Sequence, residues 1–281
     1  MELVLQIFND TSHACSRLTT ERYSSSFSRA IRMLHADLRG PIYDVYGFVR
    51  FADEIVDTFH DFDKHQLLAQ FKEETYSALD RGISLNPILH SFQLTVNKYG
   101  IDRKLIASFF SSMETDLSSK KYDREAYENY IYGSAETVGL ICLYIFCNGD
   151  KAMYVKLRPS AQSLGAAFQK INFLRDIKAD HEQLSRTYFP GVDFKNFTEQ
   201  DKRMIEADIE ADLEKAYAGL LQLPSKARFG VYLAYKYYLT LFKKIRRAEP
   251  ALLLERRVRI NNSFKAFIFL RAGLRNSFNL L

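Results

Sequence analysis

Apolar residues recur at helical spacing along almost the whole chain, and few residues interrupt the pattern. Among 281 residues there are only twelve Gly and six Pro, so turn signals are sparse. No segment shows sustained alternation of apolar and polar residues between hairpin turns, which is the pattern of a half-buried strand. Long helical stretches between sparse breakers favour an all-α protein over a sandwich or barrel. We therefore expect essentially no β-sheet.

The apolar spacing also predicts where the helices lie. The first, over 24–37, should be broken at Gly40-Pro41, and Pro41 should begin the next helix, which runs to about residue 58. Further helices are expected near 63–80, 86–99, 102–118, 123–148, 152–179, 198–221, 225–248 and 261–278. Pro159 predicts a kink or break, and 180–197 should be irregular. The chain has no repeat or Gly/Ser linker, so we expect one domain over residues 1–281.

Bulk composition narrows the classes of partner. The formal net charge is +5 with a pI near 8.9, and no basic arm is visible, so a nucleic-acid partner is not expected. A mild basic excess suits an anionic small substrate or a membrane surface. Three cysteines without a CxxC pair indicate a reduced, cytoplasmic protein. The N-terminus lacks the basic region of a signal peptide, and the apolar run 138–147 is too short to cross a bilayer.

The first motif with chemical meaning is RFADEIVD, residues 50–57. Asp53 and Asp57 are four apart, so both carboxylates project from one face of a helix. Like charges at that spacing repel, and a cation would relieve the repulsion. Magnesium prefers one or two carboxylates together with substrate phosphates. Most pairs of carboxylates at this spacing are solvent-exposed surface residues without a metal, so the interpretation as a magnesium site needs support from a second motif.

The second motif is LGAAFQKINFLRDIKAD, residues 164–180. Gln169, Asn172, Asp176 and Asp180 form one polar stripe on an otherwise apolar helix. A helix with so much apolar surface is buried, and buried polar groups need partners. Arg175 adds a group suited to phosphate. Two acidic stripes on facing helices would form a metal site at one end of a bundle, which predicts handling of a diphosphate with Mg²⁺.

Other segments carry weaker signals. Small residues in YIYGSAETVG, residues 130–139, indicate close helix packing or room for a bulky ligand. Tyr130 and Tyr132 could place a hydroxyl or a ring face near a carbocation. The serines at 24–26 either cap a helix or bind a phosphate at its N-terminus. Arg186, which precedes Tyr188, is a further candidate for anion binding.

In their order along the chain, SSFS, VYGFVRFADEIVD, YIYGSAETVG, LGAAFQKINFLRDIKAD and SRTYFP resemble the motifs of the squalene/phytoene synthase family. The resemblance runs from about residue 20 to 270. It implies a single-domain, all-α isoprenoid synthase bundle with a central cavity. It also implies head-to-head condensation of two prenyl diphosphates by a Mg²⁺-dependent prenyltransferase, with Mn²⁺ as an alternative metal.

The resemblance assigns roles to residues of this chain. Metal ligands would be Asp53, Asp57, Asn172, Asp176 and Asp180. Diphosphate and substrate contacts would come from Tyr46, Arg50, Gln169, Arg175, Arg186, Tyr188 and Ser26. Tyr132, with Asp53, Asp57 and Asp176, would act at the reacting centre. The chain departs from the family at Tyr23-Ser24-Ser25, where relatives often carry a His or Lys that contacts diphosphate.

Length and motifs together resemble the bacterial phytoene synthases, which implies condensation of two geranylgeranyl diphosphates to phytoene through prephytoene diphosphate, without NADPH. Formation of squalene or dehydrosqualene from farnesyl diphosphate is the alternative. An Asp-Glu pair at 53–54 and NFLRD at 172–176 argue against a chain-elongating synthase or a cyclase. A non-catalytic helical scaffold is the non-enzyme alternative, and would have been expected to lose some of the acidic positions.

The C-terminal segment NNSFKAFIFLRAGLRNSFNLL, residues 261–281, mixes Lys265, Arg271 and Arg275 with Phe and Leu. Such a segment either packs as an ordinary helix or lies on a membrane as a peripheral contact. Its sequence does not separate these two readings. The oligomeric state is likewise left open by the sequence.

Overall fold

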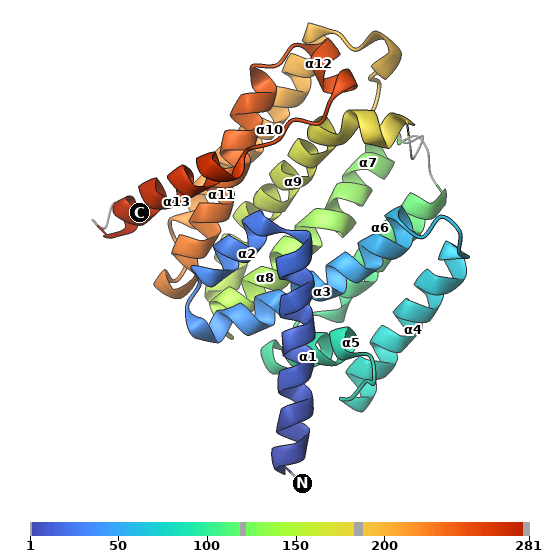
Figure 1. The fold of residues 1–281 in the computed structure, drawn as a ribbon, viewed down its shortest axis with the longest axis vertical. Coiled ribbons are helices and arrows are strands. Elements are labelled where there is room, and N and C mark those ends of the chain that lie inside the picture. Colours follow the sequence, from blue (N-terminus) through green and yellow to red (C-terminus); the bar gives the residue numbers. More distant parts are fainter. Residues whose placement is uncertain (1, 119–121, 183–187, 278–281) are drawn as a thin grey trace.

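The computed structural model describes residues 2–118, 122–182 and 188–277, and the backbone alone for residues 2, 179–182, 195, 262 and 274–277. Within these ranges it contains helices and no strand (Figure 1), so the all-α prediction is confirmed. In chain order the elements are α1 (Glu2–Tyr23), α2 (Ser25–Arg32), α3 (Ala36–Asp57), α4 (Lys64–Arg81), α5 (Pro87–Tyr99), α6 (Arg103–Ser118), α7 (Arg124–Ile131), η1 (Tyr132–Glu136), α8 (Thr137–Cys147), α9 (Lys151–Glu182), η2 (Phe194–Asn196), α10 (Glu199–Leu220), α11 (Ser225–Arg246), α12 (Pro250–Glu255) and α13 (Asn262–Ser277).

Two hydrophobic clusters flank the middle of the molecule. One is built mainly by α3 to α6 around Phe48 and Phe92, whose rings stack at 3.9 Å. The other is built mainly by α7 and α9 to α13. Helix α8 is apolar all round and serves both, since Leu140 packs in the first cluster and Leu143 in the second. The space between the clusters is therefore lined by α3 on one side and by α8 and α9 on the other.

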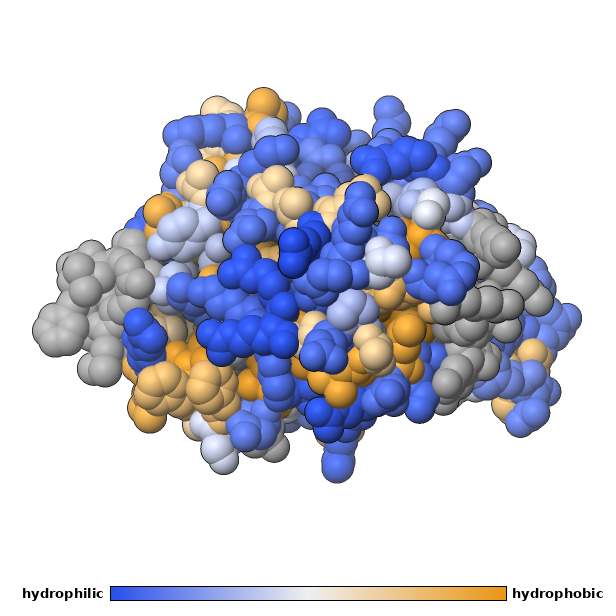
Figure 2. Space-filling view, turned by 90° about the horizontal axis from the view of Figure 1, so that it is seen from above, coloured by the Kyte–Doolittle hydropathy of each residue, from blue (hydrophilic) through white to orange (hydrophobic). Residues whose placement is uncertain are grey.

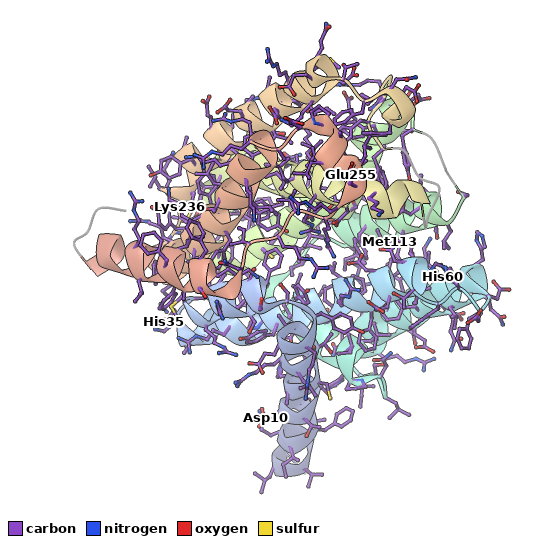
Figure 3. All side chains as sticks on the ribbon, turned by 45° about the horizontal axis from the view of Figure 1, so that its top comes forward. Asp10, His35, His60, Met113, Lys236 and Glu255 are labelled. Atoms are coloured by element: carbon purple, nitrogen blue, oxygen red, sulfur yellow. The ribbon has the colours of Figure 1, made fainter. Side chains whose placement is uncertain are left out.

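Helix α1 was not predicted from the sequence, and its packing explains why. Its fully buried positions are Ser12, Ser16 and Thr20, at a spacing of four, whereas its apolar residues near the N-terminus are exposed. Hydrophobic periodicity therefore gives no signal here. Polar pairs fix the helix to α3 and α5, among them a 2.7 Å hydrogen bond between the hydroxyls of Ser16 and Ser91. Its N-terminal half, with Asp10, projects from the body (Figure 3).

The interface between α1 and α3 also holds a buried acid paired with a histidine, and this pair makes the folded protein more stable at low pH. Asp44, fully buried, lies 2.9 Å from His13 Nδ1 and accepts a 2.7 Å bond from the Thr95 hydroxyl. The bond to Asp44 raises the pKa of His13, and burial raises the pKa of Asp44. Both groups thus hold protons more tightly in the folded chain than in the unfolded one. Their contribution to the free energy of unfolding declines as the pH rises from about 4, the ordinary pKa of Asp, through that of His.

We expect His13→Ala to lower the free energy of unfolding by roughly 1–3 kcal/mol near pH 6, since it leaves a buried carboxyl short of a partner. The difference from the unmodified chain should shrink toward pH 9, where the protonated pair has been lost. Urea denaturation at both pH values measures this, with the exposed His65→Ala as control. A loss that grows with pH would contradict the assignment.

Several predicted boundaries were wrong. Helix α3 begins at Ala36 and continues through Gly40 and Pro41. The missing N–H of Pro41 costs one bond near an exposed helix start, and burial of Leu38 and Ile42 offsets it. Helix α9 likewise continues through Pro159 without a break. The helix predicted over 123–148 is divided by the π turn η1, and α12 was not predicted.

One stretch of the described chain, Arg124–Cys147, has the length and apolar composition of a membrane-spanning helix. Half of the residues in its most apolar window are buried inside the protein. Because α8 lies between the two hydrophobic clusters, that composition is accounted for by packing.

Candidate active site

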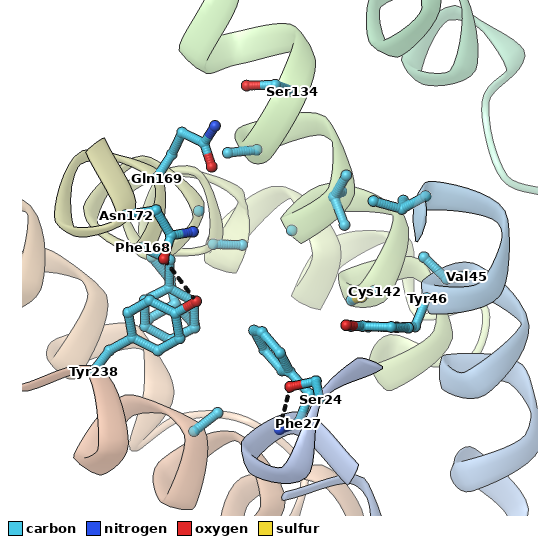
Figure 4. A pocket seen from close by; sticks show the side chains of 18 of the residues that line it. Ser24, Phe27, Val45, Tyr46, Ser134, Cys142, Phe168, Gln169, Asn172 and Tyr238 are labelled. Carbon is cyan, nitrogen blue, oxygen red and sulfur yellow. Dashed lines mark hydrogen bonds between the residues drawn. The ribbon is translucent and has the colours of Figure 1, made fainter. Parts of the chain in front are cut away.

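A cavity of about 720 Å³ lies between the two hydrophobic clusters. Figure 4 shows side chains from several helices converging on it, with Tyr46 from α3 opposite Phe168 and Gln169 from α9. Its deeper lining is mostly apolar and small, including Val138, Gly139 and Cys142. Polar groups gather on α3 and α9. The arrangement is a pocket with an apolar interior and two polar walls.

Helix α3 supplies the first polar wall. Tyr46, Arg50, Asp53 and Asp57 all line the cavity, as expected for positions three and four apart on one helix face. The pKa of Asp53 is raised to about 7, mainly by burial and also by the nearby carboxylates of Asp57 and Asp116. Asp57 is more exposed than Asp53. The first predicted motif therefore places two carboxylates in the cavity, and one of them is destabilised when ionised.

Arg50 lies on the same wall as the carboxylates. Its guanidinium bonds to Glu54 and lies 4.4 Å above the centre of the Tyr23 ring. Its Nε is buried without a hydrogen-bond partner among the described residues. A buried charged donor without a partner is costly, and an anion in the cavity could supply one.

Helix α9 supplies the second wall, with Gln169, Asn172, Arg175 and Asp176 all lining the cavity. The Tyr238 hydroxyl on α11 donates to Asn172 Oδ1 at 3.3 Å, which Figure 4 shows. Asp176 accepts from Arg175 at 3.0 and 2.5 Å and lies 2.6 Å from Arg257 Nε. The side chain of Asp180 and all of Arg186 lie outside the described residues, so their roles stay predictions.

A third polar group, absent from the sequence predictions, lies between these walls. Asp116 on α6 accepts hydrogen bonds from the hydroxyls of Tyr122 at 2.9 Å, Tyr130 at 2.8 Å and Tyr188 at 3.1 Å. Tyr188 also stacks on Phe173, with ring centroids 3.9 Å apart. Asp116, Tyr130 and Tyr188 all line the cavity. Tyr188 thus lines the cavity, and its predicted contact with substrate stays a prediction.

Two predicted site residues are not among those that line the cavity, Tyr132 and Ser26. Tyr130 and Ser134 do line it, and at about 100° per residue Tyr132 falls on the opposite side of the helix from Tyr130. Ser24 lines the cavity instead of Ser26, and its hydroxyl accepts from the Phe27 N–H at 3.2 Å. The capping reading of this serine cluster is therefore confirmed for Ser24.

Other polar contributors to the cavity were missed in the sequence. Tyr238 and Arg257 come from distant parts of the chain and lack the spacing that identified α3 and α9. Lys265 is close by, since its Nζ donates to the Ser25 hydroxyl at 3.0 Å. The one available signal was compositional, because the segment 225–275 is strongly basic.

Comparison with known proteins finds one family model and several curated relatives that match this chain. The family model described as squalene/phytoene synthase matches residues 20–263. A presqualene diphosphate synthase from Rhodopseudomonas palustris is 30% identical over 190 residues, covering 66% of this chain and 65% of that protein. A phytoene synthase from Arthrospira platensis is 25% identical over 206 residues, covering 69% and 66%. The chain thus matches just under two thirds of the length of these curated relatives.

Solved structures share the fold. A dehydrosqualene synthase in complex with a ligand superposes with a TM-score of 0.81 at 18% identity, over 96% of this chain and 98% of that one. A squalene synthase from Alicyclobacillus acidocaldarius gives a TM-score of 0.72 at 21% identity, over 86% and 95%. At these identities the likeness concerns the fold.

Proposed function

Because the chain belongs to the squalene/phytoene synthase family, we propose that it is a prenyltransferase that condenses two prenyl diphosphates head to head. The observation that carries the proposal is the pair of polar walls on α3 and α9, which face one apolar cavity. Oxygen ligands and arginines on these walls suit two diphosphate groups, and the apolar interior suits the hydrocarbon chains.

We further propose that Mg²⁺ joins the walls to the diphosphates, with Mn²⁺ as an alternative metal. Within the described part of the chain, no three His, Cys, Asp or Glu side chains form a metal site by themselves. This fits magnesium, which is usually held by one or two carboxylates together with substrate phosphates. Burial and the neighbouring carboxylates disfavour the ionised form of Asp53, and a bound cation would stabilise that form. Asp53 and Asp57 would hold metal on one wall, and Asn172 and Asp176 on the other.

When bound, the metal would neutralise charge on the departing diphosphate. The chain's own residues have separate tasks. Arg50 and Arg175 would bind diphosphate oxygens, and Tyr46 and Gln169, which line the same cavity, would lie where the chains meet. Apolar side chains such as Val138 and Phe168 exclude water, which would otherwise quench a carbocation.

The length of the substrate separates two candidates. As in the sequence analysis, we propose geranylgeranyl diphosphate as the first, giving phytoene through prephytoene diphosphate without NADPH. Farnesyl diphosphate, giving a squalene-type product, is the second. One observation favours it: the presqualene diphosphate synthase and the dehydrosqualene synthase reported above are both named for squalene-type, C30 products.

The test is product analysis after incubation of the purified chain with C15 or C20 diphosphate and magnesium, with and without NADPH. The proposal expects one C30 or C40 product that is lost when the metal is chelated. Phytoene or dehydrosqualene should form equally without NADPH, whereas squalene should form only when NADPH is supplied as the reductant. Two C20 units giving phytoene would establish the first candidate, and a C30 product formed from C15 alone would establish the second. A linear diphosphate longer by one isoprene unit would indicate chain elongation instead. No product and no magnesium-dependent diphosphate binding would support a scaffold.

A further inference from the structure

Helix α13 carries apolar residues on its outer face as well as on its inner one. Ile268 and Ala272 are buried, and the helix packs against α11. Phe264, Phe267 and Leu270 are 47%, 54% and 63% exposed. Their spacing of three places them along one line of the helix. A helix that is apolar all round is normally buried on every side, so the outer face of α13 lacks a covering partner among the described residues.

Charge is distributed very unevenly along the chain, and α13 lies in its basic part. The segment 225–275, which holds α11 to α13, has thirteen Lys and Arg and only two Asp and Glu, a net charge of +11. The remaining residues therefore carry a net charge of −6, since the total is +5. Arg271 continues the exposed line of α13, and Lys243, Arg256 and Arg259 are exposed on neighbouring elements. Exposed positive charge is thus found within the outer apolar line itself, at Arg271, and on the elements that precede α13.

The same helix adjoins the cavity. Lys265 bonds to Ser25, the neighbour of the cavity-lining Ser24. Burial lowers the pKa of Lys265, and the charges of Arg29 and Arg175 lower it further, so these three cations lie near one another. Figure 2 shows an orange, apolar surface at the lower left, next to hydrophilic surface. The exposed apolar line therefore runs from the neighbourhood of the cavity toward the C-terminus.

We propose that the outer face of α13 and the basic side chains around it bind the surface of a bilayer that contains anionic lipids. Exposed Phe and Leu beside Arg and Lys is the composition of interfacial helices, whose apolar face enters the boundary between headgroups and acyl chains. Clustered basic residues next to that face recognise anionic headgroups. A second copy of the chain fits less well, because pairing two +11 segments across one interface would bring like charges together.

The experiment uses the full chain and vesicles of phosphatidylcholine, either pure or with about one third phosphatidylglycerol. Co-sedimentation should be strong with the anionic vesicles, weak with neutral ones and reduced by salt. Phe264→Ser combined with Phe267→Ser should lower the partition coefficient on anionic vesicles by at least about tenfold. The matched control is Leu85→Ser combined with Val155→Ser, at exposed apolar positions elsewhere, and it should leave binding unchanged.

A second pair of variants tests the charges. Arg259→Glu combined with Arg271→Glu should abolish the preference for anionic vesicles, whereas Lys104→Glu, exposed on α6, should not. Circular dichroism should show that all variants stay folded, since every changed side chain is exposed. Absence of vesicle binding, or equal loss in the Leu85/Val155 control, would overturn the proposal. So would a dimer in sedimentation velocity that the Phe264/Phe267 variant dissolves, because that outcome assigns the face to a second copy.

Discussion

Asp53→Asn will remove the magnesium-dependent condensation proposed here while making the metal-free protein more resistant to heat. Loss of one group that stabilises developing charge in a closed site typically costs 10²–10³-fold in turnover, and we expect at least roughly that. An amide retains the size of the carboxylate and lacks its charge, so the metal proposed for this wall would lose the negative charge that holds it. The product assay described above measures the loss.

The gain in stability follows from the pKa of Asp53, which burial raises to about 7. A raised pKa means that the folded chain holds this proton more tightly than the unfolded chain does. The associated stability is present at low pH and is lost as the pH rises toward 7. Above that pH the ionised carboxylate opposes folding by up to roughly 4 kcal/mol. Asn removes this penalty, so the melting temperature should rise at pH 8 and change little at pH 4.

On the α9 wall, the matching substitution should lower the stability of the protein, whereas Asp53→Asn on α3 should raise it. Asp176 is paired with Arg175 and Arg257, so Asp176→Asn should lose activity and also lose stability, because the partly buried Arg175 and the exposed Arg257 each lose an ionic contact. Asp61→Asn, an exposed position beyond the end of α3, is the control for both variants. If Asp53→Asn melted at a lower temperature than the unmodified chain at pH 8, this would contradict the claim that the ionised Asp53 carboxylate destabilises the folded chain. Full turnover in either variant would remove the metal assignment from that wall.

Gly165→Ala, a change of one methyl group, will destabilise the protein by roughly 1–3 kcal/mol. A Cβ atom at this position would lie 2.5 Å from the carbonyl oxygen of Ala135 and 3.0 Å from Cα of Glu136. These are backbone atoms of η1, so no side-chain rotation relieves the clash and α9 must move away. Gly139 makes the matching approach from the other side, with a Cβ position 2.8 Å from the Ala161 oxygen.

Gly40→Ala is the matched control, since Gly40 is also helical and a Cβ there would meet nothing within 4 Å. The same substitution should stabilise the protein by up to about 1 kcal/mol, through the better helix propensity of Ala. Urea denaturation midpoints of the two variants should therefore move in opposite directions. Equal shifts would mean that the close approach of α9 to η1 contributes nothing.

The two polar walls of the site were predictable because the residues of each wall all come from a single helix. On α3 and α9, oxygen-bearing residues three or four apart interrupt an apolar pattern, and helix geometry alone brings them together. Asp116 has no such pattern around it. It is buried because Tyr122, Tyr130 and Tyr188 reach it from other parts of the chain. Contacts of that kind are set by tertiary packing, which local spacing does not encode.

The same reasoning explains the errors in the fold. Helix α1 buries hydroxyls such as Ser16 and exposes Leu3 and Ile7, so a search for an apolar stripe passes over it. A break was predicted at Gly40-Pro41, and a kink or break at Pro159, because the local cost of Pro in a helix is real. The packing of the long helices α3 and α9 outweighs that cost, and both helices continue through these residues. Rules based on local sequence predicted a helix correctly where its own apolar stripe explains its burial. They failed where contacts with a neighbouring helix decide the structure.

The π turn at Tyr132–Glu136 has a consequence for how relatives are aligned with this chain. Such a turn is equivalent to one extra residue within a helix, and it often occurs at functional sites. A relative with an uninterrupted helix here would reach the same end points with one residue fewer. Matching letters across 130–139 would then pair side chains that face different ways, and the counterpart of Tyr130 would stand one column away. In an alignment, residues on either side of this turn are therefore best matched by the side of the cavity that they face. A one-residue gap should be allowed within the turn.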